Sequence, residues 1–299
     1  MVSDWQNEAS SVPVLDDRYE LGPMIGEGSI GRVFAARDLE LGIQVAVKVM
    51  RSELARHPEL VRAFAEEAKL SARMMSPHVV KVLGLAVSRE GAPCIVYELL
   101  EGESLAARLD REGGLPLAET AEIVRQTARA LARAHAMGVI HRDVKPDNIF
   151  LAKHPDGGTL VKLLDFGIAE RTAGPFGAAS DMLVGTPEYM APEIVLGRCR
   201  ADARADVYAL GVVAFECLTG RCPFPGEHID EIMIALTRGA RPELGELRPD
   251  LPPEADEWMD RALHPDPYWR FATAKEASDA IDEVTRAAQP RRAALRRAA

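Results

Sequence analysis

The stretch that most constrains the fold is HRDVKPDNIF, residues 141–150. It brings an acid at Asp143, a cation at Lys145 and an amide at Asn148 close together along the chain. Apolar residues before it, at 139–140, and after it, at 149–151, predict two short strands. We therefore expect the polar side chains on a loop that is held at both ends. The alternative interpretation is a polar surface turn that contains a proline.

A loop of this kind can hold a carboxylate next to a hydroxyl group while an amide oxygen faces a metal ion. Phosphoryl transfer to an alcohol needs this combination, because it depends on positioning and charge neutralisation more than on covalent chemistry. The rest of the chain has to decide between this chemistry and an ordinary turn.

Length and composition exclude several classes of protein. The 299 residues are enough for one large domain or two lobes, and a formal net charge of -10 argues against nucleic acid as a partner. No apolar signal-peptide core follows Met1, and the most apolar run, residues 207–218, contains Glu216 and is too short to span a bilayer. We expect a cytoplasmic protein without a transmembrane segment. Its cysteines form no CxxC pair and fit reduced thiols: Cys94, Cys199, Cys217 and Cys222.

Changes of pattern along the chain predict two lobes. Residues 1–18 are polar and without periodicity, and we expect a disordered leader there. Strand patterns and one helix dominate residues 19–98, whereas helical patterns dominate residues 103–285. Residues 286–299 contain five arginines and no acid. This basic tail is interpreted as a frayed helix end, as a contact for an anionic surface or partner, or as part of a linker to further domains.

A glycine-rich turn, GEGSIGRV at residues 26–33, has the pattern GxGxxGxV between two apolar strands. Glycines let a backbone approach phosphates closely, and the N–H groups of such a turn can face an anion. The same spacing marks dinucleotide-binding folds, but there the turn joins a strand to a helix. We therefore favour a hairpin that covers phosphate groups.

The next strand, VAVKV at residues 45–49, should place its three valines on one face and Ala46 and Lys48 on the other. A helix predicted at about residues 60–75 carries Glu67 on its apolar stripe. A buried carboxylate without a partner is costly, so we expect Glu67 to pair with Lys48, whose ammonium group can also contact phosphates. The alternative places Glu67 in water at the edge of the helix.

Asp165 ends a predicted strand, VKLLD, and the tripeptide DFG begins with it. A carboxylate in this position can face a hard cation, and Asn148 can supply a second oxygen ligand. An ordinary turn would also explain DFG, but its place after the loop of Asn148, across a predicted hairpin, favours the metal site.

Taken in order, these motifs resemble those of the eukaryotic-type serine/threonine protein kinases that bacteria also carry. The resemblance extends over about residues 19–285 and rests on the glycine-rich turn, VAVK, the helical glutamate, HRDVKPDN, DFG, GTPEYMAPE, DVYALG and a late arginine in DPYWRF. It implies an α+β, two-lobe protein-kinase fold. Residues 19–98 would form an antiparallel sheet with one helix, and residues 103–285 would form a mainly helical lobe.

The resemblance also implies catalytic roles. Asp143 would be the catalytic base, and Lys145 would steady the transferred phosphate. Asn148 and Asp165 would hold Mg2+, or Mn2+ in its place. Thr186 would hydrogen-bond Asp143 and Lys145 and leave space for an aliphatic hydroxyl, as in the serine/threonine subclass.

The same resemblance implies an ATP site between the lobes. Lys48, aligned by Glu67, would contact the phosphates, and Tyr97 would occupy the gatekeeper position behind the adenine. The residues expected to contact ATP are Ile25, Gly26, Glu27, Gly28, Ser29, Ile30, Gly31, Arg32, Val33, Ala46, Lys48, Glu98, Leu100, Asn148 and Asp165.

Further motif residues resemble supporting positions of the family. Glu193 resembles the acid that pairs with a late arginine, here Arg270, and Asp206 resembles the acid that ties down the backbone of the catalytic loop. Arg142 resembles the arginine that receives a phosphate on the activation segment, and Ser180 stands where bacterial relatives often carry a phosphorylated threonine. We hypothesise that phospho-Ser180 pairs with Arg142 and orders that segment.

The implied activity is ATP-dependent transfer of the γ-phosphate to serine and threonine hydroxyls of proteins. The chain itself would be among the substrates, through a transient homodimer. One alternative is a catalytically silent pseudokinase scaffold, but every catalytic position is intact. Another is a small-molecule kinase that shares D-x-x-x-x-N, but such an enzyme has no reason to carry GTPEYMAPE, which builds a peptide-binding ledge in protein kinases.

Overall fold

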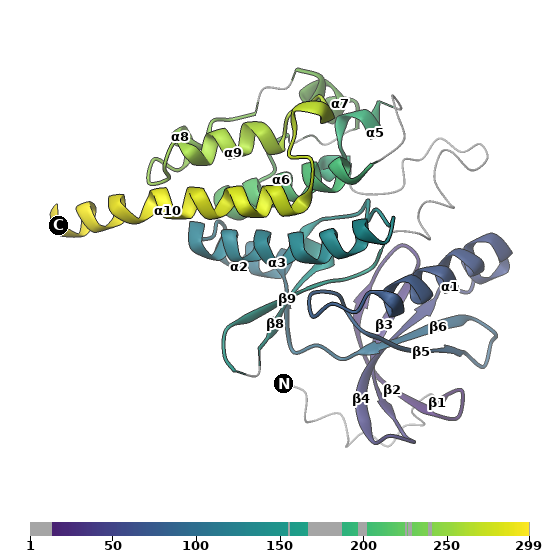
Figure 1. Ribbon diagram of the computed structural model, residues 1–299. Helices are drawn as coiled ribbons and strands as arrows, with labels where there is room; N and C mark the ends of the chain where they lie inside the picture. The colour runs from purple at the N-terminus through teal and green to yellow at the C-terminus, as the bar shows by residue number, and fades with distance from the viewer. Residues whose placement is uncertain are drawn as a thin grey trace. The chain divides into compact units, whose positions relative to one another are not determined.

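The computed structural model describes residues 14–154, 156–166, 187–196, 202–224, 226, 229–238 and 241–298. The chain forms two compact units (Figure 1). The N-terminal unit contains residues 14–75 and 79–101, and the C-terminal unit contains residues 76–78, 102–166 and the described residues from 187 onward. Within these residues, the larger sheet lies wholly in the N-terminal unit, and every α-helix except α1 lies in the C-terminal unit.

The N-terminal unit is built on a six-stranded antiparallel sheet with the order β1-β2-β3-β4-β6-β5. Val45 and Val47 of β4 are fully buried, and Val49 packs against the same apolar cluster. Lys48, between them, contacts helix α1 instead. The predicted alternation is confirmed, and the valines lie on the face of the sheet opposite α1. The strands are β1 (Val14–Leu15), β2 (Tyr19–Glu27), β3 (Gly31–Asp38), β4 (Ile43–Met50), β5 (Val82–Val87) and β6 (Pro93–Glu98).

Helix α1 (Pro58–Arg73) packs against β5 and β6. A proline stands in its first turn, where the missing N–H group has no partner to lose. Leu60, Phe64 and Ala68 recur at the helical period and are buried. The helix predicted at about residues 60–75 is thus present, with its bounds shifted by two residues.

The prediction of a disordered leader over residues 1–18 is wrong for its last residues. Val14–Leu15 forms strand β1, which pairs with β2, and Leu15 is buried in the apolar cluster. Arg18 forms an ion pair of 2.7 Å with Asp38, whose side chain is almost fully buried. The hydrogen bond from Arg18 lowers the pKa of the Asp38 carboxyl. One buried apolar residue and contacts of Arg18 with distant residues, Asp38 and Glu40, hold this segment in place, so no periodicity reveals it.

The C-terminal unit is organised around α6 (Ala203–Thr219). This helix is apolar on all sides, is almost wholly buried and contacts α3, α9 and α10. Asp202 caps its first turn, and Gly220, with φ of 73°, ends it in the left-handed conformation. The other helices are α2 (Leu105–Glu112), α3 (Leu117–Ala136), α5 (Pro192–Val195), α7 (Ile229–Arg238), α8 (Leu244–Leu247), α9 (Glu254–Ala262) and α10 (Ala274–Ala298).

A small three-stranded sheet, β7-β8-β9, lies next to the loop at residues 141–148, which is called the catalytic loop from here on, in the same unit. It consists of β7 (Gly102–Ser104), β8 (Ile149–Lys153) and β9 (Thr159–Leu163). The strand expected after the loop is therefore present as β8, but the strand expected at residues 139–140 is wrong. The Val139 N–H group donates to Ala134 at the end of α3, and the N–H group of His141 donates to Asp206. These N–H groups are therefore hydrogen-bonded to the end of a helix and to a buried acid, and not to a neighbouring strand.

The backbone of α10 is helical to Ala298, so the predicted boundary between domain and basic tail at residue 285 falls inside a helix. Over the described part of the chain, no helix combines the length and the apolar character needed to cross a membrane.

Candidate active site

The catalytic-loop residues named from the sequence lie together in the C-terminal unit. Lys145 Nζ is 2.9 Å from Asp143 Oδ1. The amide nitrogen of Asn148 donates to Asp143 Oδ2 at 2.6 Å and to the Asp143 carbonyl at 2.8 Å. The turn η3 (Pro146–Asn148) leads from these residues into β8. Asp143 is thus fixed from two sides, with one cation beside its charge.

The side-chain amide of Asn148 is oriented by Asp143. Its amide nitrogen is bound to Asp143, so the amide oxygen lies at the other end of the planar group. The Leu164 N–H group donates to the Asn148 carbonyl at 2.8 Å, which holds the chain next to Asp165 against the loop. Among the residues that the structure describes, no group of three or more His, Cys, Asp or Glu side chains could hold a metal ion. One amide oxygen and one carboxylate fit Mg2+, which keeps water and phosphate oxygens as further ligands.

His141 connects the catalytic loop to the segment that contains Asp165. Its buried ring lies 4.7 Å from the ring of Phe166. The Asp143 N–H group donates to Nδ1 of His141 at 3.2 Å, and Nε2 lies 2.9 Å from the Leu164 carbonyl. Because a backbone N–H group can only donate, Nδ1 accepts and Nε2 carries the proton. The neutral ring therefore bridges two segments by a donor on one side and an acceptor on the other.

Asp206 binds the backbone of the catalytic loop, as the family resemblance implies. Its Oδ2 accepts from the His141 N–H group at 2.8 Å and its Oδ1 from the Arg142 N–H group at 2.8 Å. Oδ2 also lies 2.7 Å from Nε2 of His135, near the end of α3. His135 was not singled out from the sequence. An acid within the apolar sequence of α6 needs hydrogen-bond donors, and a histidine shortly before the loop could be one of them. Only the packing of α3 against α6 shows that His135 is this donor.

The predicted contact between Lys48 and Glu67 is present in the N-terminal unit. Lys48 Nζ is 3.7 Å from Glu67 Oε1, and both side chains are less than a tenth exposed. Lys48 Nζ also lies 5.9 Å from the centre of the Phe64 ring. The alternative that placed Glu67 in water is wrong, because Glu67 is 3% exposed.

The glycine-rich turn joins β2 to β3, as predicted, and its N–H group at Gly28 donates to Gly31 at 2.9 Å. Gly31 requires glycine, because a Cβ there would lie 2.3 Å from the Val49 carbonyl oxygen. Along β4 and β6, Ala46 is paired with Tyr97, and both are buried. The remaining residues predicted to contact ATP in this unit are Ile25, Gly26, Glu27, Ser29, Ile30, Arg32, Val33, Glu98 and Leu100, all on β2, β3, β6 or the segments that follow them.

The supporting pair Glu193 and Arg270 is present as a buried, two-point contact with distances of 2.8 and 2.7 Å. Sequence reasoning missed the contact between Tyr189 and Glu216, where the hydroxyl donates to Oε2 at 2.6 Å. Burial raises the pKa of the Glu216 carboxyl. Thr186, Ser180 and Cys199 lie outside the described residues.

Comparisons with known proteins agree with this geometry. The protein kinase domain family matches residues 19–281. PknA of Mycobacterium tuberculosis, a serine/threonine-protein kinase, is 38% identical over 282 residues, which are 93% of this chain and 64% of PknA. PknB of Mycolicibacterium smegmatis, also a serine/threonine-protein kinase, is 38% identical over 88% of this chain and 42% of its own length. The chain thus spans less than two thirds of the length of these relatives.

Solved structures show the same fold. The kinase domain of Mycobacterium tuberculosis PknI superposes with a TM-score of 0.69 and 30% identity, and covers 92% of this chain and 99% of that one. Rad53 residues 1–466 in complex with AMP-PNP superpose with a TM-score of 0.70 and 27% identity over 86% of this chain and 62% of that one. The α+β kinase fold predicted from the sequence is confirmed. The chain belongs to the protein kinase family, and within it to the eukaryotic-type serine/threonine kinases of bacteria.

Proposed function

We propose that this protein transfers the γ-phosphate of ATP to serine and threonine hydroxyls of proteins. The observation that carries the proposal is the arrangement of Asp143, Lys145 and Asn148, in which one carboxylate is held by a cation and an amide. The loop that bears them is braced by buried Asp206, so the positions are set before any substrate binds.

Each residue of the loop has a defined part in this reaction. The Asp143 carboxylate accepts the proton of the substrate hydroxyl, whose oxygen forms a bond to the γ-phosphorus. The bond between that phosphorus and the oxygen bridging it to the β-phosphorus breaks, and ADP leaves with the electron pair. Lys145, already beside Asp143, offsets negative charge on the transferred group. Thr186, from the sequence, would select an aliphatic hydroxyl at this point.

Asn148 and Asp165 are the residues that would hold Mg2+, or Mn2+ in its place. When bound, the metal ion neutralises phosphate charge and orients the phosphate chain. The orientation of the Asn148 amide toward Asp143 supports this assignment, because it leaves the amide oxygen as the group for a cation.

The N-terminal unit would supply the rest of the nucleotide site. The turn between β2 and β3 would cover the phosphates with its backbone N–H groups, and Lys48, aligned by Glu67, would contact them. The structural similarity to Rad53, which was solved with AMP-PNP, supports ATP as the nucleotide. We further propose that the protein acts in the cytoplasm and phosphorylates itself through a transient homodimer.

A transfer assay with radiolabelled ATP tests the proposal and separates it from the pseudokinase alternative. We expect the wild-type chain to label itself and a general protein substrate, and Asp143→Asn to lower the rate by about 10²- to 10⁴-fold. In Asp143→Asn, the new amide oxygen can still accept the hydrogen bond from Asn148, so the variant should fold. A wild-type chain that binds ATP but transfers no phosphate would support the scaffold instead.

A further inference from the structure

Arg51, which directly follows β4, contacts the glycine-rich turn at three of its residues. Its backbone N–H group donates to the Ile30 carbonyl at 3.0 Å. Its Nε and Nη2 atoms donate to the Gly28 carbonyl at 3.2 and 3.1 Å. Nη2 also donates to Glu27 Oε1 at 2.9 Å. One residue of the neighbouring strand end thus holds the tip of the turn.

The contact with Gly28 fixes the orientation of a peptide plane. In a planar trans peptide, the carbonyl of one residue and the N–H group of the next point in opposite directions. The structure contains no cis peptide bond among its described residues. Since Arg51 holds the Gly28 carbonyl, the N–H group of Ser29 is directed to the other side of the turn. Backbone N–H groups of such turns are the groups that bind phosphate oxygens.

A second arginine supports the same turn. Arg32 Nε donates to Glu27 Oε1 at 3.0 Å, so the Glu27 carboxylate is shared by two guanidinium groups. The hydrogen bond from Arg32, followed by the two positive charges, lowers the pKa of Glu27. The Glu27 carboxylate therefore stays charged at neutral pH and keeps Arg51 in place beside Gly28.

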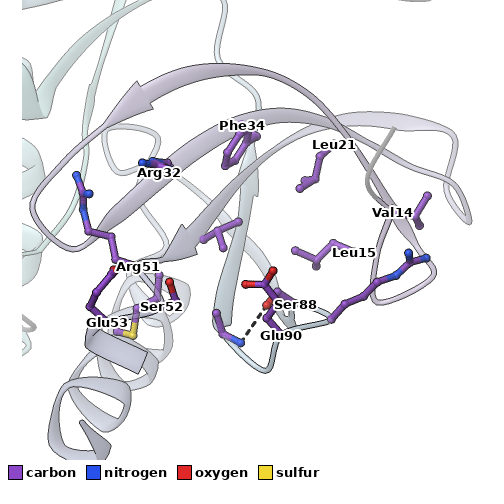
Figure 2. Close-up of a pocket in the computed structure, with 14 residues that line it drawn as sticks. Val14, Leu15, Leu21, Arg32, Phe34, Arg51, Ser52, Glu53, Ser88 and Glu90 are labelled. Atoms are coloured by element: carbon purple, nitrogen blue, oxygen red, sulfur yellow. Dashed lines mark hydrogen bonds between the residues drawn. The ribbon is translucent and has the colours of Figure 1, made fainter. Parts of the chain in front are cut away.

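Arg51 and Arg32 also line a cavity of about 410 Å³ in the N-terminal unit (Figure 2). Leu15, Leu21 and Val49 line it too, and they belong to the apolar cluster on the face of the sheet opposite α1. The Arg51 side chain is 35% exposed. Arg51 is not a member of that apolar cluster, and Arg89, which lines the same cavity, offers a matched control.

We propose that Arg51 is a positioning residue of the nucleotide site, and this inference rests on the proposed function. Arg51 holds the Gly28 carbonyl on one side of the turn, so that the Ser29 N–H group faces the phosphate chain of ATP on the other. Arg51 makes no contact with the nucleotide in this account. Its effect is to fix the peptide plane before ATP binds, which removes part of the ordering cost of binding.

Binding of two ligands separates this role from a general structural one. AMP-PNP with Mg2+ carries the phosphate chain, whereas adenosine lacks it. For Arg51→Gln we expect AMP-PNP to bind about five- to tenfold more weakly, as for the loss of one charged hydrogen bond, and adenosine to bind as in the wild type. Arg51→Lys should lie between the two, because one ammonium group cannot hold Gly28 and Glu27 in the same fork geometry. Arg89→Gln should leave both affinities unchanged, because the exposed Arg89 side chain contacts Asp17, 3.9 Å away, and not the glycine-rich turn.

Equal losses for adenosine and AMP-PNP in Arg51→Gln would overturn the proposal, since they would indicate a distorted unit. Unchanged AMP-PNP binding would overturn it as well. In kinetics, the KM for ATP should rise while kcat changes less.

A second readout needs no nucleotide. The backbone amide NMR signals of Ser29 and Ile30 should shift in Arg51→Gln and stay in place in Arg89→Gln. If the wild type bound AMP-PNP no more tightly than adenosine, the proposed function would fail. The Ser29 signal would still decide whether Arg51 fixes the peptide plane, and an unshifted signal would refute it.

Discussion

The carboxylate of Asp206 holds the backbone of Arg142 in a left-handed conformation. Its Oδ1 accepts from the Arg142 N–H group at 2.8 Å, and φ of Arg142 is 68°. Residues other than glycine adopt this region at a cost of about 1–2 kcal/mol. Asp206 belongs to the buried helix α6 and is fully buried itself. The strain next to Asp143 is therefore held by a group from the core of the C-terminal unit.

Asp206→Asn should destabilise the protein by about 1–3 kcal/mol. The two oxygens of Asp206 accept from the N–H groups of His141 and Arg142, and in asparagine one of these oxygens is replaced by an NH2 group, which cannot accept. The backbone of the catalytic loop would relax, and phosphate transfer should fall together with stability. Urea denaturation measures the first effect and the transfer assay the second.

Asp202→Asn is the matched control on the same helix. Asp202 caps α6 from an exposed position, and asparagine caps helices about as well as aspartate. The free energy of unfolding of the Asp202→Asn variant should stay within about 0.5 kcal/mol of the wild-type value. Equal stability losses in the two variants would contradict a special role for Asp206.

The ion pair between Lys48 and Glu67 should show strong coupling. Removing one partner leaves the other charge buried, so Lys48→Met or Glu67→Gln should each cost about 3–5 kcal/mol. The double variant should cost less than the sum of the two, because it removes both charges of the pair together. Thermal unfolding of the four proteins gives the coupling energy.

Glu66 and Lys69 provide the control pair on the same helix. Their atoms are closer, at 2.7 Å, but both side chains are more than half exposed. Water screens this pair, and its coupling should stay below about 0.5 kcal/mol. A larger coupling for Glu66 and Lys69 than for Lys48 and Glu67 would show that distance, and not burial, sets the strength.

Arg270→Lys should destabilise the C-terminal unit although it keeps the charge. Arg270 holds both oxygens of Glu193 and also donates to the carbonyls of His264 and Pro265. A lysine cannot reproduce this planar fork, so we expect a loss of about 2–4 kcal/mol in chemical denaturation.

Arg261→Lys is the comparison variant for this loss. Arg261 pairs with Glu276 at the surface, where both side chains are about two fifths or more exposed. The change there should cost less than about 1 kcal/mol. Similar costs at Arg261 and Arg270 would argue that burial of the Glu193 pair adds nothing.

His78 should make the protein less stable in mild acid. Its ring is buried, Nδ1 lies 3.2 Å from the Val161 carbonyl, and desolvation lowers its pKa from 6.5. The unfolded chain therefore binds a proton at a higher pH than the folded one. Stability is fully present above the unfolded pKa of 6.5 and falls as pH drops from there toward the folded pKa.

The melting temperature between pH 7.5 and 5.5 checks this expectation. We expect a steeper decline for the wild type than for His78→Gln, whose amide can still donate to Val161 and does not titrate. His57→Gln, at an exposed histidine, should follow the wild-type curve. Parallel curves for the wild type and His78→Gln would rule out His78 as the source of acid sensitivity.

Much of the candidate site follows from local patterns. Strand alternation places Lys48 opposite the valines of β4, and the helical period places Glu67 on the buried face of α1, so these two periodicities are enough to predict their contact. The glycine pattern between two strands likewise gives the hairpin turn. The order of motifs around Asp143 identifies the family.

Other features follow only from tertiary packing. Three contacts are of this kind: the pairing of β1 with β2, the hydrogen bond from His135 to Asp206, and the hydrogen bonds from Arg51 to Gly28. Each connects residues that lie in different elements. Residues 139–140 have a strand-like pattern, yet the backbone donors of Val139 and His141 go to α3 and to Asp206. The sequence by itself determined the buried faces of β4 and α1 and the motifs that identify the family. Only the tertiary structure decided which buried group satisfies which partner, because periodicity encodes burial, whereas hydrogen bonds depend on how distant elements pack.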